Sequence, residues 1–399
     1  TRLCKLSRGL GDVYKRQAED LPEASFAGQL ESYLGVRGEQ QLLDAVRRCF
    51  ASLFTDRAIS YRINNGFDHM AVALSVGVQR MVRSDLAGAG VAFTVDTETG
   101  FPRAVLVTAG VGLGETIVQG MVEPDEYHVF KPLLANTALS PIIHKECGSK
   151  LQKLVCSLDN AAAPTELVAT TRSERDAYVL SDDEVLQIAR WATAIEDHYG
   201  TAMDIEWAKD GETGELFIVQ ARPETVQSTR RDSRFRTYSL RTHGSLLVSG
   251  LAIGEAIATG PVCRLDHPGQ IGEFQTGAIL VTGRTDPDWV PIMKRAAAIV
   301  TDHGGRTSHA AIVSRELGLP AIVGAQDATS RLSDGQVVTV SCCEGDQGHV
   351  YEGEAESDVT EFDLTRLPAT RTKVMLNVAN PSAAFHWWRL PSDGVGLAR

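Results

Sequence analysis

The sequence lacks the patterns that mark several common classes of protein. Its 399 residues contain no apolar run near the ~20 residues that a membrane-spanning helix needs, and the first residues do not form the apolar segment of a signal peptide. There is no long run of Lys and Arg, and the formal net charge is −12. Because nucleic-acid phosphates are bound by clustered cations, we expect no nucleic-acid partner. We also expect a soluble, cytoplasmic protein that does not bind a membrane.

Cysteines with metal-binding spacing are also missing. The seven cysteines are odd in number and scattered, and none forms a CxxC pair or a Cys/His cluster. This pattern indicates free thiols in a reducing compartment. Hydrophobic residues make up 43% and charged residues 23%, so the chain has enough apolar surface to bury a core. Its length suggests roughly two to three domains.

Two polar stretches divide the chain. Residues 229–244 are rich in Arg and Ser, and residues 353–372 are polar and acidic. Such segments are typical of connectors between domains that move relative to one another. We therefore predict the following divisions: a leader at 1–17, a first domain at 18–228, a linker at 229–244, a second domain at 245–352, a linker at 353–372 and a short piece at 373–399.

Both predicted domains alternate strands and helices, which indicates an α/β protein. In the first, residues 90–95 and 104–108 are expected to be strands around a turn, and 181–198 an amphipathic helix with a Ser181/Glu184 capping box. In the second, four short strands are expected, at 278–282, 298–301, 321–324 and 337–341.

Residues 202–224 predict a β-hairpin around the turn sequence DGETG. Centring the hairpin on Thr213 places Glu206 opposite Gln220 and Asp204 opposite Arg222. Since strand side chains alternate between faces, all four share one face. Carboxylate and amide oxygens suit Mg²⁺, and a guanidinium group suits a phosphate. The alternative is an exposed polar strand face with ordinary cross-strand pairs.

The run GVGLGETIVQG at 110–120 is a weaker signal. Its glycines, including Gly112 and Gly114, permit close backbone approach to a phosphate. The run has no GK[ST] and no dinucleotide fingerprint, so it is neither a P-loop nor a Rossmann motif. An ordinary strand-to-helix turn is the competing interpretation.

The segment HGGRTSHAAIVSRELGLPAIVG at 303–324 predicts a helix with a histidine in its first turn. Thr307 or Ser308 caps the helix, which runs to about residue 317 and stops at Gly318. His309 then lies among free backbone N–H groups, where an anion is favoured. The helix dipole is expected to lower the pKa of His309 and keep the ring neutral and nucleophilic.

The alternative for His309 is a capping or core residue. We expect the small neighbours Ala310 and Ala311 and the preceding glycines to leave the ring accessible, which favours function. His303 is interpreted as structural or supportive.

Several segments together resemble the phosphoenolpyruvate synthase family and its relative pyruvate phosphate dikinase. GGRTSHAAIVSRELGLPAIVG resembles the family's phosphohistidine signature. Residues 18–29, 72–101 and 112–132, and the hairpin ending VQARPET, resemble its ATP-grasp module; residues 374–399 resemble the opening of its phosphoenolpyruvate-binding barrel. The resemblance implies a partial ATP-grasp domain, a swivelling β/α phosphohistidine domain and the first strand and helix of a TIM-type barrel.

The resemblance also implies a reaction. ATP would phosphorylate His309, AMP and orthophosphate would leave, and pyruvate would accept the phosphoryl group to give phosphoenolpyruvate. Full-length relatives of this kind imply a homo-oligomer. The implied residue roles are Mg²⁺ binding by Glu206 and Gln220; ATP binding by Asp204, Glu206, Gln220, Arg222, Ser25, Gly28, Gly112 and Gly114; binding of pyruvate or phosphoenolpyruvate by Arg399; and phosphorylation of Thr307 by a regulatory kinase/phosphorylase.

Some features depart from the family pattern. Ser308 stands where many synthases have Cys, which leaves the subtype open but does not affect the nucleophile. The chain lacks the N-terminal grasp half and nearly all of the barrel, and residues 1–17 resemble no part of the family and are expected to be an artefact. We therefore expect a fragment that binds nucleotide poorly and does not turn over.

Other functions remain as alternatives. Pyruvate phosphate dikinase passes a phosphoryl group to orthophosphate instead of water, and antibiotic or glucan dikinases differ beyond the shared modules. A histidine phosphocarrier loaded by phosphoenolpyruvate would not need the hairpin residues. A structural or regulatory remnant would fit a chain that binds no nucleotide.

Overall fold

The structure is a computed structural model. It describes residues 2–6, 20–21, 24–25, 32–64, 66–70, 72–136, 138–157, 164–224, 234–306, 308–364, 370–378, 384 and 387–398. Two compact units make up the chain. The first comprises residues 1–94, 105–118 and 124–225, and the second comprises 95–104, 119–123 and 226–399. Two short segments from the N-terminal half thus belong to the second unit.

A six-stranded sheet forms the centre of the first unit, with the order β13-β12-β6-β7-β8-β9. The strands are β6 (Gly88–Phe93), β7 (Ala104–Val111), β8 (Asp125–Phe130), β9 (Ile142–Glu146), β12 (Met203–Lys209) and β13 (Leu216–Pro223). The two strands predicted around the turn are confirmed as β6 and β7. Nearly every residue of β6 and β7 is buried, as expected for central strands covered on both faces.

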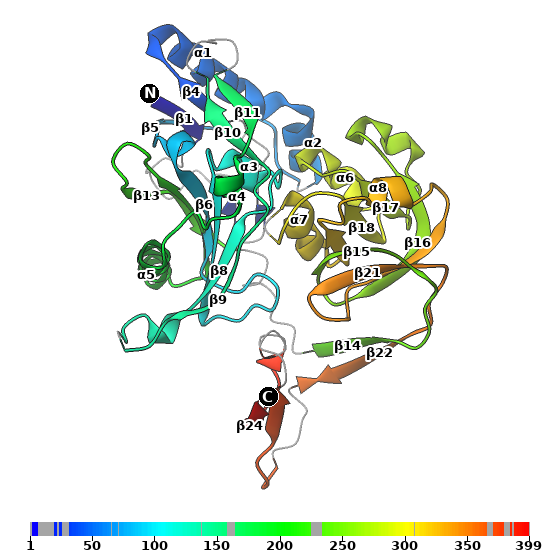
Figure 1. Cartoon of the computed structure of the whole chain (residues 1–399). Coiled ribbons are helices and arrows are strands. Elements are labelled where there is room, and N and C mark those ends of the chain that lie inside the picture. The colour runs from blue at the N-terminus through cyan, green and yellow to red at the C-terminus, as the bar shows by residue number, and fades with distance from the viewer. Residues whose placement is uncertain are drawn as a thin grey trace. The chain divides into compact units, whose positions relative to one another are not determined.

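Helix α5 (Asp182–Tyr199) packs on this sheet (Figure 1). It begins at the predicted capping box, in which Ser181 accepts from the backbone N–H of Glu184 and the Glu184 carboxylate accepts from that of Ser181. It ends at Gly200, whose φ of 69° closes the last turn. Its apolar stripe, which includes Val185 and Ile188, is buried against the sheet.

Smaller elements complete the first unit. The strands β1 (Arg2–Leu6), β4 (Tyr33–Val36) and β5 (Val76–Arg80) form one small sheet; β10 (Gln152–Cys156) and β11 (Thr165–Ala169) form a second; β2 (Asp20–Leu21) and β3 (Ala24–Ser25) form a third. The helices are α1 (Gly38–Ala51), α2 (Asp56–Asn64), α3 (Glu115–Val118) and α4 (Arg172–Arg175). Strand β1 lies between β4 and β5 in its sheet, and the leader at residues 1–17 stays a prediction.

A closed seven-stranded barrel forms the second unit, with the order β15-β19-β18-β17-β16-β20-β21. Its strands are β15 (Leu246–Ile253), β16 (Ile257–Arg264), β17 (Ile279–Thr282), β18 (Ala298–Thr301), β19 (Ala321–Val323), β20 (Val337–Ser341) and β21 (Gln347–Glu352). The helices α6 (Val290–Met293), α7 (His309–Leu317) and α8 (Ala328–Arg331) lie beside them (Figure 1). All four strands predicted here are confirmed, and β16 to β19 pair in parallel.

The two predicted linkers pair with each other, which the sequence did not indicate. β14 (Arg234–Leu240) and β22 (Ser357–Asp363) form a two-stranded antiparallel ribbon. Arg236 pairs with Glu361 at 2.7 Å, and Arg241 pairs with Asp358 at 2.5 Å. The basic composition of one stretch and the acidic composition of the other thus complement each other across the ribbon. The two stretches thus form a paired ribbon, and their role as linkers between moving domains stays a prediction.

The C-terminal strands β23 (Met375–Val378) and β24 (Gly394–Ala398) pair in parallel. This is a strand–connection–strand unit, and a TIM-type barrel built from it stays a prediction.

The sequence led us to expect no membrane-spanning helix and free cysteines, and both points can be compared with the described residues. No helix among them is long and apolar enough to cross a membrane. Six cysteines are free thiols in the described part of the chain: Cys49, Cys147, Cys156, Cys263, Cys342 and Cys343.

A buried ion pair lies in the first unit. The Lys150 and Asp125 side chains are 1% and 0% exposed, and the ammonium group contacts the carboxylate. The same carboxylate accepts from the backbone N–H groups of Gly148 and Val179, at 2.9 Å and 2.8 Å. Because every polar group here is satisfied by the others, removal of one charge leaves its partner buried and uncompensated.

We expect Lys150→Met to lower the free energy of unfolding by about 3–5 kcal/mol, because Asp125 keeps a buried charge without a counter-ion. Urea unfolding followed by fluorescence measures the loss. The matched control is Lys145→Met, which removes a lysine whose ion pair with Asp182 is exposed, and it should cost far less. Equal losses for the two variants would contradict the argument.

Candidate phosphohistidine site and nucleotide hairpin

His309 is the first residue of α7, which joins the parallel strands β18 and β19. Ser308 is the N-cap, with extended backbone at φ −67° and ψ 158°, and its hydroxyl accepts from the backbone N–H of Ala311 at 3.4 Å. At the other end, Gly318 adopts φ 70° and terminates the helix. The predicted boundaries are confirmed, and Ser308 is the cap. A group attached to His309 therefore lies at the end of the helix that favours an anion.

Thr285 fixes the His309 ring. Its hydroxyl Oγ1 lies 2.9 Å from His309 Nδ1, and Thr285 itself is buried, with 4% of its surface exposed. Thr285 follows β17, the strand that pairs in parallel with β18. Loops that leave the carboxyl ends of neighbouring parallel strands meet at one edge of the sheet. With Nδ1 held by Thr285, Nε2 is the ring nitrogen left for chemistry.

Burial lowers the pKa of His309 from its ordinary 6.5 to about 4. The ring is therefore neutral at pH 7, as its expected nucleophilic role requires. The predicted direction is confirmed, but burial is the cause in place of the helix dipole.

The neighbours Ala310 and Ala311 do not line an open site. They are 2% and 0% exposed and belong to the core beneath the barrel. Their small size matters because it lets α7 pack closely on the strands. The two alanines are therefore core residues, and the His309 ring itself is half-buried.

Gly120, the last glycine of the 110–120 run, has a structural reason to be glycine. Its φ is +64°, and a Cβ built there would lie 2.5 Å from the Cβ of Ser308 and 3.4 Å from the backbone nitrogen of His309. A side chain would therefore collide with the helix cap. Gly120 belongs to the second unit, where its backbone abuts the N-terminus of α7.

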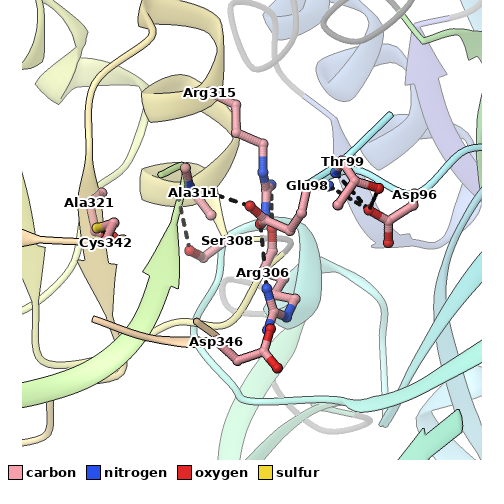
Figure 2. Close-up of polar contacts among 11 residues, drawn as sticks. Asp96, Glu98, Thr99, Arg306, Ser308, Ala311, Arg315, Ala321, Cys342 and Asp346 are labelled. Atoms are coloured by element: carbon pink, nitrogen blue, oxygen red, sulfur yellow. Dashed lines mark hydrogen bonds and ion pairs between the residues drawn. The ribbon is translucent and has the colours of Figure 1, made fainter. Parts of the chain in front are cut away.

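An ionic network flanks the loop that leads into His309 (Figure 2). Arg315 on α7 donates to the carbonyl oxygen of Arg306 and to the Glu98 carboxylate. The Arg306 guanidinium lies 3.8 Å from Glu98 and 3.3 Å from Asp346. The sequence analysis identified none of these four residues, because their chain separations carry no recognisable spacing.

The hairpin of β12 and β13 has the predicted register at both site pairs. Asp204 lies opposite Arg222 and Glu206 opposite Gln220. A bulge between Glu206 and Trp207 then shifts the register by one residue, so that Trp207 pairs with Ile218. The four polar side chains therefore share one face as predicted, although the hairpin is not symmetric about Thr213.

Arg222 is held by Asp204 within this hairpin. Its Nε and Nη2 lie 2.8 Å and 2.6 Å from Asp204 Oδ2, and Asp204 is 9% exposed. The Asp204 carboxylate thus orients the Arg222 guanidinium group, and this ion pair forms without a ligand. Glu206 and Gln220 are half-buried beside them.

The residues fit a Mg²⁺ site only in part. Among the described residues no group of three or more His, Cys, Asp or Glu side chains could hold a metal ion. Glu206 and Gln220 supply two oxygen donors from paired positions. Mg²⁺ commonly takes few protein ligands and completes its shell with water and phosphate oxygens. The pair is therefore compatible with Mg²⁺ shared with a nucleotide.

Gly112 has a structural reason to be glycine. Its φ is +91°, and a Cβ there would lie 2.6 Å from the carbonyl oxygen of Leu154. Its neighbour Gly114 would place a Cβ 3.3 Å from Ala89. Close packing of the loop within the first unit thus accounts for Gly112, and nucleotide binding by Gly112 and Gly114 stays a prediction.

The structure does not describe the side chains of four predicted site residues. Gly28, Thr307 and Arg399 lie outside the described residues, and Ser25 is placed on β3 without a described side chain.

Two families match the chain. The family described as "Pyruvate phosphate dikinase, AMP/ATP-binding domain" matches residues 16–241, which include the hairpin. The family described as "PEP-utilising enzyme, mobile domain" matches residues 274–345, which include His309.

Curated relatives match nearly the whole chain. A phosphoenolpyruvate synthase of Synechocystis sp. is 55% identical over 404 residues, covering 99% of this chain and 49% of the relative. That of Escherichia coli (strain K12) is 51% identical over 383 residues, 96% of this chain and 48% of the relative. The phosphoenolpyruvate synthase of Pyrococcus furiosus is 41% identical over 397 residues, covering 96% of this chain and 47% of the relative. The chain spans about half the length of the curated relatives it matches.

The lowered pKa of His309 predicts a pH-dependent stability. As the pH falls from 6.5 towards 4, the unfolded state binds a proton that the folded ring does not, so stability is lost on acidification. We expect the wild type to lose about 2–3 kcal/mol more than His309→Gln across this window, allowing for partial exposure of the ring. Unfolding free energies at both ends of the window, compared between the two proteins, measure the difference. Identical losses would show that the ring titrates normally.

Proposed function

The chain belongs to the family of the pyruvate phosphate dikinase AMP/ATP-binding domain, and from this premise we propose that it is part of an enzyme that makes phosphoenolpyruvate from pyruvate with ATP. In the complete protein ATP, pyruvate and water would give AMP, phosphoenolpyruvate and orthophosphate. This chain would supply part of the nucleotide site and the residue that carries the phosphoryl group. The chain by itself is expected to be inactive.

The observation that carries the proposal is the state of His309. The ring is neutral, its Nδ1 is held by Thr285, and it stands at the N-terminus of α7. With Thr285 accepting from Nδ1–H, the Nε2 lone pair is the nucleophile. Nε2 attacks the β-phosphorus of ATP, the bond from that phosphorus to the oxygen shared with the α-phosphorus breaks, and AMP leaves. Water then releases the terminal phosphate, and the remaining phosphoryl group passes from Nε2 to the enolate oxygen of pyruvate.

The α7 N-terminus supports the phosphorylated state. The first backbone N–H groups of a helix have no intrahelical partner and point toward an attached anion. Phosphoryl transfer depends mainly on positioning and on stabilisation of negative charge, which this geometry supplies without rearrangement. The hydrogen bond between Thr285 and Nδ1 keeps the ring from rotating while the phosphoryl group passes from ATP to pyruvate.

The hairpin is proposed to bind the nucleotide. Arg222, oriented by Asp204, would contact phosphate oxygens, and Glu206 and Gln220 would hold Mg²⁺. The ion, when bound, neutralises oxygens of the β- and γ-phosphates. Contributions from Ser25, Gly28, Gly112 and Gly114 to the phosphate site, and of Arg399 to the pyruvate site, are part of the same proposal. So are regulation at Thr307, a homo-oligomer, a role in gluconeogenesis and a cytoplasmic location.

The relatives favour water over orthophosphate as the second acceptor, because those reported above are phosphoenolpyruvate synthases and not pyruvate phosphate dikinases. A histidine phosphocarrier is disfavoured by the presence of the ATP-binding family over residues 16–241.

The proposal is tested on the chain joined to the missing halves of a relative, incubated with Mg²⁺ and β-³²P-ATP. We expect acid-labile, base-stable label that pyruvate discharges and that is absent from His309→Ala. Thr285→Val should label more slowly, by about tenfold or more, because the ring loses its fixed tautomer and orientation. A folded, nucleotide-binding protein that takes no label would refute the proposal.

Glu206→Gln tests the metal assignment. Loss of a carboxylate from a site with few protein ligands should raise the Mg²⁺ concentration for half-maximal labelling by about tenfold or more. Glu215→Gln changes an exposed residue just before β13; it is the matched control and should not alter this concentration. If both variants need the same Mg²⁺ as the wild type, Glu206 is not a ligand.

A further inference from the structure

The turn between β6 and β7 is built to present Glu98. One oxygen of Asp96, Oδ1, accepts from the backbone N–H groups of Glu98 and Thr99, at 3.2 Å and 2.7 Å, and from the Thr99 hydroxyl at 2.7 Å. The backbone N–H of Gly100 donates to the Asp96 carbonyl at 2.9 Å, and Gly100 has a φ of +71°. Side-chain-to-backbone bonds of this kind fix a turn without help from neighbouring elements. The Glu98 side chain therefore projects from a preorganised support.

Glu98 contacts two arginines of the segment around His309 and the backbone of Gly254. Its Oε1 accepts from Arg315 and lies 3.8 Å from the Arg306 guanidinium, and its Oε2 accepts from the backbone N–H of Gly254 at 3.4 Å. All of these residues belong to the second unit. The Glu98 side chain is only 12% exposed, so its charge interacts with the two arginines with little screening by water.

The two arginines shape the loop before His309. Arg315 is 5% exposed and donates to the carbonyl of Arg306, which ties α7 back to the loop that precedes it. The loop closes at once, because the backbone N–H of Ser308 donates to the carbonyl of Gly305 at 3.0 Å. Arg306 lies inside this closed turn. Its guanidinium group is shared between Glu98 and Asp346 (Figure 2).

Two cations and two anions form the ion pairs of this network. Arg306 and Arg315 carry two positive charges, and Glu98 and Asp346 carry two negative charges. A phosphoryl group on His309 would add a charge of about −1.5 to −2 beside this loop. Phosphate oxygens bind guanidinium groups at least as well as a carboxylate does, and they repel a neighbouring carboxylate. The two anions then compete for the same arginines.

We propose that Glu98 is a positioning residue that holds Arg306 and Arg315 while His309 is unmodified, and that a phosphoryl group on His309 displaces it by binding the same guanidinium groups. The inference rests on the proposed function in one respect, namely that His309 is the residue phosphorylated. It adds a phosphorylation-dependent contact to that site: the Val95–Ala104 turn is bound in one state and released in the other.

The competition has a reciprocal consequence. If phosphorylation weakens the contact of Glu98 with the arginines, then that contact must oppose phosphorylation by the same factor. Removal of the Glu98 charge should therefore favour the phosphorylated state, although it deletes a contact of the folded protein. A purely structural role predicts the opposite or no effect.

The test uses this chain and potassium phosphoramidate, a chemical phosphoryl donor to imidazole, so that ATP is not needed. The P–N bond of phosphoramidate breaks, the Nε2–P bond forms, and ammonia leaves with the displaced proton. ³¹P NMR follows both the rate of labelling and the titration of the attached phosphoryl group. We expect Glu98→Gln to be labelled about fivefold faster than the wild type, with phosphoryl ionisation shifted to lower pH.

The matched control is Glu354→Gln, which removes an exposed carboxylate of the same unit and should behave as the wild type. Equal behaviour of Glu98→Gln and Glu354→Gln would overturn the proposal. A second comparison asks whether the effect passes through the arginines: the acceleration should shrink when Glu98→Gln is combined with Arg306→Met. An acceleration of unchanged size would show direct repulsion alone and would also overturn it.

The outcome separates this inference from the proposed function. Failure of labelling by ATP leaves the phosphoramidate comparison intact, because the chemical donor needs no nucleotide site. A folded wild-type chain that phosphoramidate does not label at His309 overturns the displacement itself.

Discussion

Parallel pairing of β18 and β19 is the constraint on which the site depends. Parallel neighbours cannot be joined by a tight turn, so the chain must cross from the carboxyl end of one strand to the start of the next, and α7 is that crossover. The N-terminus of the helix therefore lies at the carboxyl edge of the strands. The loop after β17 reaches the same edge, which brings Thr285 to His309. The positions of His309, of the Thr285 hydroxyl beside its ring and of the α7 N-terminus follow from one topological requirement.

Burial at this edge determines the chemistry of the histidine. Small residues behind the ring let α7 sit tightly on the barrel, and the resulting loss of water lowers the pKa of His309 to about 4. A neutral imidazole is the form that can attack phosphorus. The same dry surroundings strengthen the interactions between Glu98 and the arginines, so that a new dianion would disturb them strongly. The neutral state of His309 and the proposed response of Glu98 to its phosphorylation thus have one physical origin.

The hairpin directs several polar side chains to one surface. Strand alternation places Asp204, Glu206, Gln220 and Arg222 on a common face, and cross-strand pairing aligns them. The bulge lies just beyond Glu206, so it bends the rest of the hairpin without disturbing these pairs. Asp204 then fixes Arg222 before a ligand arrives, which reduces the ordering cost of binding a phosphate.

The sequence by itself determined the features that depend on near neighbours in the chain. Capping residues predicted both ends of α5 and α7, and alternation and turn residues predicted the register of the site pairs. These succeed because hydrogen bonds within a few residues fix them. Only the tertiary structure decided what depends on distant segments. Thr285 lies 24 residues from its partner His309, and Glu98 lies 217 residues from its partner Arg315; neither separation leaves a pattern in the sequence. The pairing of β14 with β22 also leaves no pattern in the sequence, because neither strand has an apolar face. Each of these strands is identified only by its pairing with the other. Burial, too, is a property of the packed barrel, which is why the direction of the His309 pKa shift was predictable and its cause was not.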